Sequence, residues 1–191
     1  MVKSSSGAKA KAPNERLFHD LATVKAPKNS EHKVTKPVWQ ILVDKRTGMK
    51  FTGFYDKKSS IVEPTCQRLV YLETMAGKSV QYLRQDNAGE NKKLAARLKS
   101  LDWKRETVME YTAKATPQQN SYAELGFTVL AARGRATMNH ANVPGDMRYK
   151  LWPDCINGVT KMGRLTVIEL FVIKKTRCEH YCGNSLSWRL I

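Results

Sequence analysis

The order of its apolar segments constrains the fold of this chain more than any other feature. Three β-rich segments follow one another through short loops, and helical and β-rich segments then alternate. Consecutive strands followed by alternation with helices are typical of a mixed sheet covered on both faces. The sequence therefore predicts an α/β fold with a mixed five-stranded sheet and helices on both faces. The expected strands are 15–24, 38–43, 49–55, 80–85 and a fifth within 103–111, and the expected helices are 61–76, 87–101 and 117–138.

Local signals define several of these boundaries. Residues 45–48 have the composition of a hairpin turn between the second and third strands. Ser59 or Ser60 is expected to cap the first helix, and Gly77 is expected to end it. Asn87 and Glu90 have the spacing of a capping box for the second helix.

Positive charge dominates the composition. The 191 residues include 33 Lys and Arg against 17 Asp and Glu, a formal net charge of +16. An excess of this size indicates a polyanionic partner, and nucleic acid is the obvious one. No apolar run approaches the roughly 20 residues of a membrane span, and the N-terminus lacks the apolar centre of a signal peptide. We therefore expect an intracellular protein with no membrane partner, whose four cysteines are reduced thiols.

The length and a composition of 41% hydrophobic residues suit one folded domain. Residues 1–14, dominated by Lys, Ser, Ala and Gly, are expected to form a disordered basic tail. Residues 15–145 form the predicted core, and residues 146–191 form a C-terminal extension of it. In that extension we expect a helix from Asp146, a strand at 165–173 and few further secondary-structure signals.

Two acids lie where a metal site could form. Asp86 ends the strand that begins at Val80, and Glu124 lies beside the apolar stripe of the helix that follows Pro117. An acid at a strand end and an acid on a helix that crosses the sheet supply the oxygen ligands that a hard divalent cation prefers.

A third acid could come from either of two strands. Asp20 lies in or near the end of the first strand, although an aspartate there could also be a turn acid or a helix cap. Asp44 ends the second strand and is its rival for the same role. His19 is adjacent to Asp20, but a lone histidine beside a strand is more often packed or solvated than a metal neighbour.

These segments resemble the integrase core of copia-type retrotransposons. RQDNAGEN and TPQQNSYAE resemble the second and third acidic motifs of that family, and LFHDLATVKAP resembles the first. ILVDKRTGMKFTGFY resembles its second strand, hairpin and third strand, and the similarity continues through WPDCINGVTKM and TRCEHYCGN. The resemblance covers the chain from about Glu15 to its C-terminus. It favours Asp20 over Asp44, because Asp44 matches a position that caps the hairpin in the family.

The resemblance implies an RNase H-like fold and a specific chemistry. Asp20, Asp86 and Glu124 would be the catalytic, metal-binding acids of a polynucleotidyl transferase that uses Mg²⁺ or Mn²⁺. Such an enzyme trims the 3′ ends of element DNA and joins them to target DNA, with two ions about 3.5 to 4 Å apart. It also implies a homo-oligomer when active, a cytoplasmic particle before integration and the nucleus during it.

Two departures from the family bear on activity. No residue before His19 could form the zinc-binding module that precedes the core in the family, so we expect a fragment of a longer polyprotein or a decayed copy. Leu125 to Phe127 follow the glutamate where the family has basic residues. Cys178, His180 and Cys182 do not have the spacing of a zinc site, and the family has a poorly structured extension there.

Several polar and basic residues are candidates for nucleic-acid contacts. Amide side chains before the third helix could bond phosphate or base edges, or only cap that helix. Basic residues on the second and third helices could contact phosphate, or form a solvated face. The candidates are Gln118, Gln119, Asn120, Lys92, Lys93, Arg133 and Arg135.

Two other functions remain open on the sequence. A non-catalytic nucleic-acid-binding remnant of an integrase would keep the fold and the charge but not the assembly with DNA. An RNase H-like nuclease that cleaves hybrids would need a fourth acid in the site and a hybrid-binding surface, and the sequence identifies neither.

Overall fold

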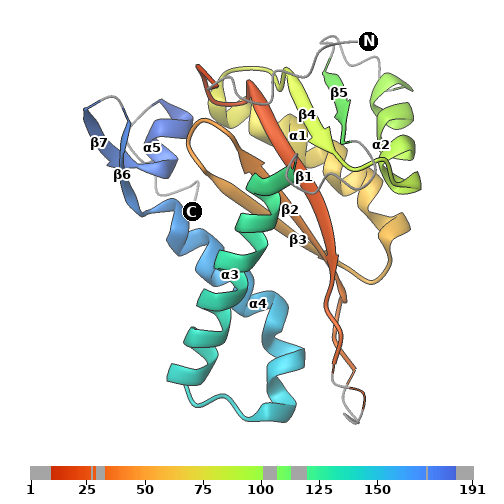
Figure 1. Cartoon of the computed structure of the whole chain (residues 1–191), viewed down its shortest axis with the longest axis vertical. Coiled ribbons are helices and arrows are strands. Elements are labelled where there is room, and N and C mark those ends of the chain that lie inside the picture. The colour runs from red at the N-terminus through yellow and green to blue at the C-terminus, as the bar shows by residue number, and fades with distance from the viewer. Residues whose placement is uncertain are drawn as a thin grey trace.

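A mixed five-stranded sheet forms the centre of the molecule. The computed structural model describes residues 10–26, 28, 33–100, 107–112, 120–170 and 172–183. The sheet order is β3-β2-β1-β4-β5 (Figure 1). β1 pairs antiparallel with β2 and β2 with β3, whereas β4 runs parallel to β1 and to β5. The strands are β1 (Arg16–Thr23), β2 (Val38–Asp44), β3 (Lys50–Tyr55), β4 (Tyr82–Gln85) and β5 (Val108–Tyr111). The predicted sheet is confirmed.

Helices cover both faces of this sheet, as predicted. On one face, α1 and α2 pack on a core that includes Leu17, Leu83 and Leu94. On the other face, α3 and α4 pack on a second core that includes Phe18, Trp39 and Ile156 (Figure 1). The helices are α1 (Val62–Ala76), α2 (Gly89–Ser100), α3 (Ser121–His140) and α4 (Gly145–Arg164). No helix in the described part of the chain is both long and apolar enough to cross a bilayer.

The start of α1 differs from the prediction. Neither serine caps it: Ser59 and Ser60 lie in a short 3-10 helix, η1 (Lys58–Ile61), that leads directly into α1. The N-cap residue is Ile61, whose side chain makes no capping hydrogen bond. The predicted end is confirmed, since Gly77 takes the left-handed conformation with φ 61°.

The C-terminal segment is more ordered than the sequence suggested. The predicted single strand at 165–173 is two short strands, β6 (Val167–Leu170) and β7 (Ile173–Thr176), which form a separate antiparallel sheet. A further helix, α5 (Arg177–Cys182), begins with a capping box in which the Thr176 hydroxyl accepts a bond from the Glu179 amide. Cys178 and Tyr181 of α5 are buried in the first core, so α5 belongs to the folded domain.

The ordered core also begins before Glu15. Asn14 is fully buried, and its side-chain amide donates to the carbonyl groups of Leu72 (3.0 Å) and Lys78 (2.8 Å). The Tyr181 hydroxyl donates to the Asn14 side-chain oxygen. Residues 1–9 of the predicted basic tail lie outside the described residues.

Two glycines allow α3 to approach its neighbours closely. A Cβ added at Gly126 would lie 2.6 Å from Ile41 Cδ1, and one added at Gly134 would lie 2.5 Å from Ile156 Cδ1. Real Cβ atoms do not approach so closely, so a larger residue at either position would require the Ile41 or Ile156 side chain, or the helix itself, to shift. The position of α3, and with it the position of Glu124, depends on these contacts.

Replacing Gly134 by valine should lower the free energy of unfolding by about 2 to 3 kcal/mol, because the new side chain overpacks the contact with Ile156. Gly158→Ala in α4 is the control: nothing lies within 4 Å of the added Cβ, and better helix propensity should raise stability by about 0.5 to 1 kcal/mol. Urea unfolding measures both. Equal effects of the two variants would contradict the close packing at Gly134.

Candidate functional site

Asp20 and Asp86 lie on adjacent parallel strands. β1 and β4 are in register with Leu17 opposite Leu83 and Phe18 opposite Arg84. Side chains alternate along a strand, so Leu17 and Leu83 face the first core, whereas Phe18 faces the second core beneath α3. Continuing the register by two residues brings Asp20 opposite Asp86, on the α3 face.

The first turn of α3 is fixed to the same part of β1. The Asn120 side-chain amide donates to the His19 carbonyl (3.3 Å), and the Tyr122 ring stacks on Phe18 with centroids 4.7 Å apart. Glu124 follows Asn120 by four residues and therefore lies on the same side of the helix. It is exposed at the edge of the buried stripe, as the sequence predicted.

The pKa of Asp20 is affected by the other two acids. It is raised from 3.8 to about 6, mainly by burial and to a smaller extent by the negative charges of Asp86 and Glu124. Hydrogen bonds from the Leu21 amide (2.8 Å) and the Asn120 side chain oppose the rise. Asp20 thus holds a proton more readily than an ordinary aspartate, which is typical of a site where carboxylates gather.

A buried polar network lies beneath β1 and β4 on the opposite face. His19 is fully buried, with Nδ1 3.1 Å from Gln85 Oε1 and Nε2 2.8 Å from Gln40 Nε2. Gln85 Oε1 can only accept and Gln40 Nε2 can only donate, so His19 carries its proton on Nδ1 and is neutral. Burial lowers its pKa to about 4. His19 is therefore a packed side chain that supports the strand carrying Asp20.

Asp86 is held by the turn into α2. Its Oδ1 accepts from the Ala88 amide (3.3 Å) and from the Asn91 side chain, which also donates to the Asp86 carbonyl (3.2 Å). Asn91 is buried, and its own carbonyl accepts from Gln85 Nε2 (3.4 Å). Asp86 is nevertheless exposed.

Asp44 lies apart from this group. It pairs with Leu17, so its side chain is on the face opposite to that of Asp20. Its oxygens accept from the Asn14 amide (2.9 Å), the Thr47 amide (2.7 Å) and the Thr47 hydroxyl (2.8 Å). Asp44 is fully buried and closes the β2–β3 hairpin, the role that its family position implied.

The donor chemistry of Asp20, Asp86 and Glu124 suits a hard divalent cation, since all three offer carboxylate oxygens at the same edge of the sheet. As the side chains stand, however, no three acidic, histidine or cysteine groups within the described residues are arranged as a metal-binding set. The acids are electrostatic neighbours, and their metal-binding role stays a prediction.

The predicted nucleic-acid contacts are distributed over several surfaces. Asn120 lies with the acids, while Gln118 and Gln119 lie outside the described residues. Lys92 and Lys93 are exposed on α2, and Arg133 and Arg135 are exposed on α3, so the two basic pairs lie on helices that cover opposite faces of the sheet.

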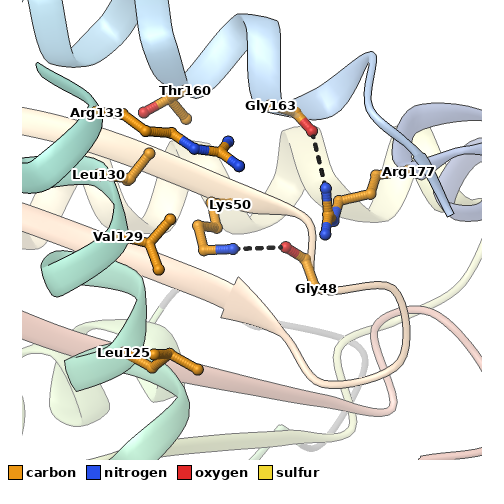
Figure 2. Close-up of a pocket in the computed structure, with 9 residues that line it drawn as sticks. All are labelled: Gly48, Lys50, Leu125, Val129, Leu130, Arg133, Thr160, Gly163 and Arg177. Atoms are coloured by element: carbon orange, nitrogen blue, oxygen red, sulfur yellow. Dashed lines mark hydrogen bonds between the residues drawn. The ribbon is translucent and has the colours of Figure 1, made fainter. Parts of the chain in front are cut away.

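Sequence analysis did not identify Lys50 and Arg177. Both line a pocket together with Arg133, between the β2–β3 hairpin, α3, α4 and α5 (Figure 2). They come from segments far apart in the sequence, and no local pattern connects them.

The chain has the fold of retroviral integrase catalytic cores. It resembles the HTLV-2 integrase catalytic core domain solved with magnesium in a trimeric form, at a TM-score of 0.60 and 15% identity, over 90% of this chain and 99% of that one. The dimeric form of the same domain gives a TM-score of 0.58 at 15% identity, over 90% and 98%. A chain of the simian T-cell lymphotropic virus intasome, solved with PP2A regulatory subunit B56 gamma, gives 0.61 at 15% identity over 94% of this chain and 58% of that one.

No protein-family model matches the sequence, and no curated protein matches it. At 15% identity, the structural likeness establishes the RNase H-like fold. The chain spans 58% of the length of the intasome chain.

Proposed function

We propose that this chain is an integrase-type polynucleotidyl transferase core that uses Asp20, Asp86 and Glu124 to join DNA 3′ ends to target DNA. One observation carries the proposal: parallel strands β1 and β4 and the first turn of α3 bring three acids of distant sequence to one edge of the sheet, where the charges of Asp86 and Glu124 raise the pKa of Asp20. The HTLV-2 core of the same fold was solved with magnesium, which supports Mg²⁺ or Mn²⁺ as the cofactor.

The three acids would hold the divalent cation, which when bound activates the attacking oxygen and stabilises the leaving oxygen. The remaining work falls to the chain itself. Asn120 orients Asp20 through its hydrogen bond and fixes the start of α3 against β1. Asn91 donates to one carboxylate oxygen of Asp86, and the residue remains exposed. With a pKa of about 6, Asp20 exchanges a proton near neutral pH, so cation binding there competes with protonation.

The substrate class follows from charge and motif. A net charge of +16 favours a DNA partner, and the RQDNAGEN and TPQQNSYAE segments favour a copia-type retrotransposon as the source. Trimeric and dimeric forms of the HTLV-2 core support a homo-oligomer. Such a protein would act in the nucleus after assembly in a cytoplasmic particle.

The test is strand transfer of a short duplex into plasmid DNA by the purified chain, with Mg²⁺ or Mn²⁺. We expect metal-dependent joining that falls to background in Asp86→Asn and in Glu124→Gln, because each variant removes a charged ligand but keeps the side-chain size. Asp154→Asn, an exposed acid of α4, is the matched control and should retain activity. Activity that survives Asp86→Asn and Glu124→Gln would refute the assignment.

A non-catalytic nucleic-acid-binding remnant is the second candidate. Leu125, 63% exposed directly after Glu124, favours it, because a basic residue is expected there in an active family member. Salt-sensitive DNA binding without strand transfer in the unmodified protein would establish this alternative.

A further inference from the structure

A basic pocket lies on the far side of α3 from β4. Its volume is about 270 Å³, and three cations enter it from three elements: Lys50 from β3, Arg133 from α3 and Arg177 from α5. Figure 2 shows these side chains reaching the same space, with Gly48 and Gly163 at its edge. We call this site the basic pocket.

No acid in the described part of the chain forms an ion pair with these cations: none of the ion pairs there involves Lys50, Arg133 or Arg177. Lys50 Nζ donates to the Gly48 carbonyl (3.2 Å), and Arg177 Nη1 donates to the Gly163 carbonyl (3.4 Å). Arg177 Nε is buried without an acceptor among the described residues. A buried guanidinium donor that lacks an acceptor is costly unless a ligand supplies one.

The cations also destabilise one another. The pKa of Lys50 is lowered to about 8, mainly by burial and to a smaller extent by the charges of Arg177 and Arg133. Burial and the charge of Arg133 lower the pKa of Arg177 as well. An anion in the pocket would remove this repulsion and satisfy the free donors.

The cationic side chains that line the pocket suit a tetrahedral oxyanion. Guanidinium groups pair with phosphate through two parallel N–H bonds, and an ammonium adds a point charge.

We propose that the basic pocket binds a phosphate group through Lys50, Arg133 and Arg177. The phosphate comes either from a nucleic-acid backbone or from a free anion such as pyrophosphate. It is not the reacting phosphate, because Arg133 lies nine residues beyond Glu124, roughly 14 Å along the helix axis. The proposal does not depend on catalysis, since a non-catalytic remnant would keep the same pocket.

The first experiment follows acetylation of Lys50 by acetic anhydride at pH 7.5 in the unmodified chain, read by peptide mass spectrometry. Saturating pyrophosphate should slow the reaction roughly tenfold for each unit by which the bound anion raises the pKa of Lys50. Exposed Lys150 of α4 is the internal control and should react at an unchanged rate. Equal rates at Lys50 with and without pyrophosphate would overturn the proposal.

The second experiment compares Arg133→Gln with Lys150→Gln by calorimetric titration of pyrophosphate. Both variants remove one positive charge from an exposed helix position and should fold. Loss of a charged hydrogen-bond donor should weaken pyrophosphate binding about tenfold in Arg133→Gln and hardly at all in Lys150→Gln. Equal weakening in both variants would mean that only net charge matters, and would overturn the pocket.

A duplex DNA titration over a range of salt concentrations separates the two sources of phosphate. If the pocket holds a backbone phosphate, Arg133→Gln weakens duplex binding, lowers the salt slope by about 1, and pyrophosphate competes with the duplex. If it holds a free anion, only pyrophosphate binding changes. Either result supports the pocket, and neither depends on strand transfer.

Discussion

Replacing Asp20 by asparagine should raise the free energy of unfolding at pH 7.5 by about 2 to 3 kcal/mol while it removes strand transfer. The folded protein raises the pKa of Asp20 from 3.8 to about 6, so the ionised side chain is less favourable folded than unfolded. Asparagine is neutral at every pH, and its side-chain oxygen can still accept from Leu21. The variant thus removes the free-energy cost of holding an ionised carboxylate at this position in the folded protein.

The pH dependence of this difference follows from its sign. The destabilisation by ionised Asp20 is complete above its folded pKa of about 6 and disappears as the pH falls towards 3.8. The gain in free energy of unfolding from Asp20→Asn should therefore shrink across that range. His19 has the opposite effect: its folded pKa of about 4 makes the protein less stable as the pH falls from 6.5 to 4. The comparison must therefore be variant against parent at each pH.

Urea unfolding at pH 7.5 and at pH 4.5 measures this effect. Asp154→Asn is the matched control, because its exposed side chain should change stability by less than about 0.5 kcal/mol at either pH. Lower stability of Asp20→Asn at pH 7.5 would show that Asp20 is a structural acid and would count against its proposed role.

Replacing Asp44 by alanine should have the opposite result and lower the free energy of unfolding by about 3 to 4 kcal/mol. The substitution leaves the amides of Asn14 and Thr47 and the Thr47 hydroxyl without their acceptor inside the protein. Each buried donor left unpaired costs about 1 to 3 kcal/mol. Burial raises the pKa of Asp44, which offsets part of the loss, because a charged group leaves the interior.

Thermal or urea unfolding of Asp44→Ala against Asp56→Ala tests this role. Asp56 is exposed just beyond β3, so its removal should leave stability within about 0.5 kcal/mol of the parent. A gain in stability for Asp44→Ala would mean that its desolvation outweighs its hydrogen bonds. Together with the Asp20 result, this distinguishes Asp20, whose charge destabilises the fold, from Asp44, whose hydrogen bonds stabilise it.

Much of the architecture could be read from local patterns. Short β-rich runs predicted all five strands of the main sheet. Gly77 marked the end of α1, because glycine adopts the left-handed backbone conformation found there without strain. The C-terminal helix was missed although Thr176 and Glu179 have the spacing of a capping box. At six residues, α5 is too short for an apolar period to reveal it, and its stability comes from Cys178 and Tyr181 in the core.

The sequence by itself determined the strands, the main helices and the positions of the candidate acids along them, because these depend on residues close together in the chain. Tertiary structure decided which acids meet. The register of β1 against β4 puts Asp20 beside Asp86 beneath α3, and antiparallel pairing with β2 turns Asp44 to the opposite face. The tertiary structure also brings Lys50, Arg133 and Arg177 together around one pocket. Pairing and packing join residues that are distant in sequence, so no local pattern could specify these contacts.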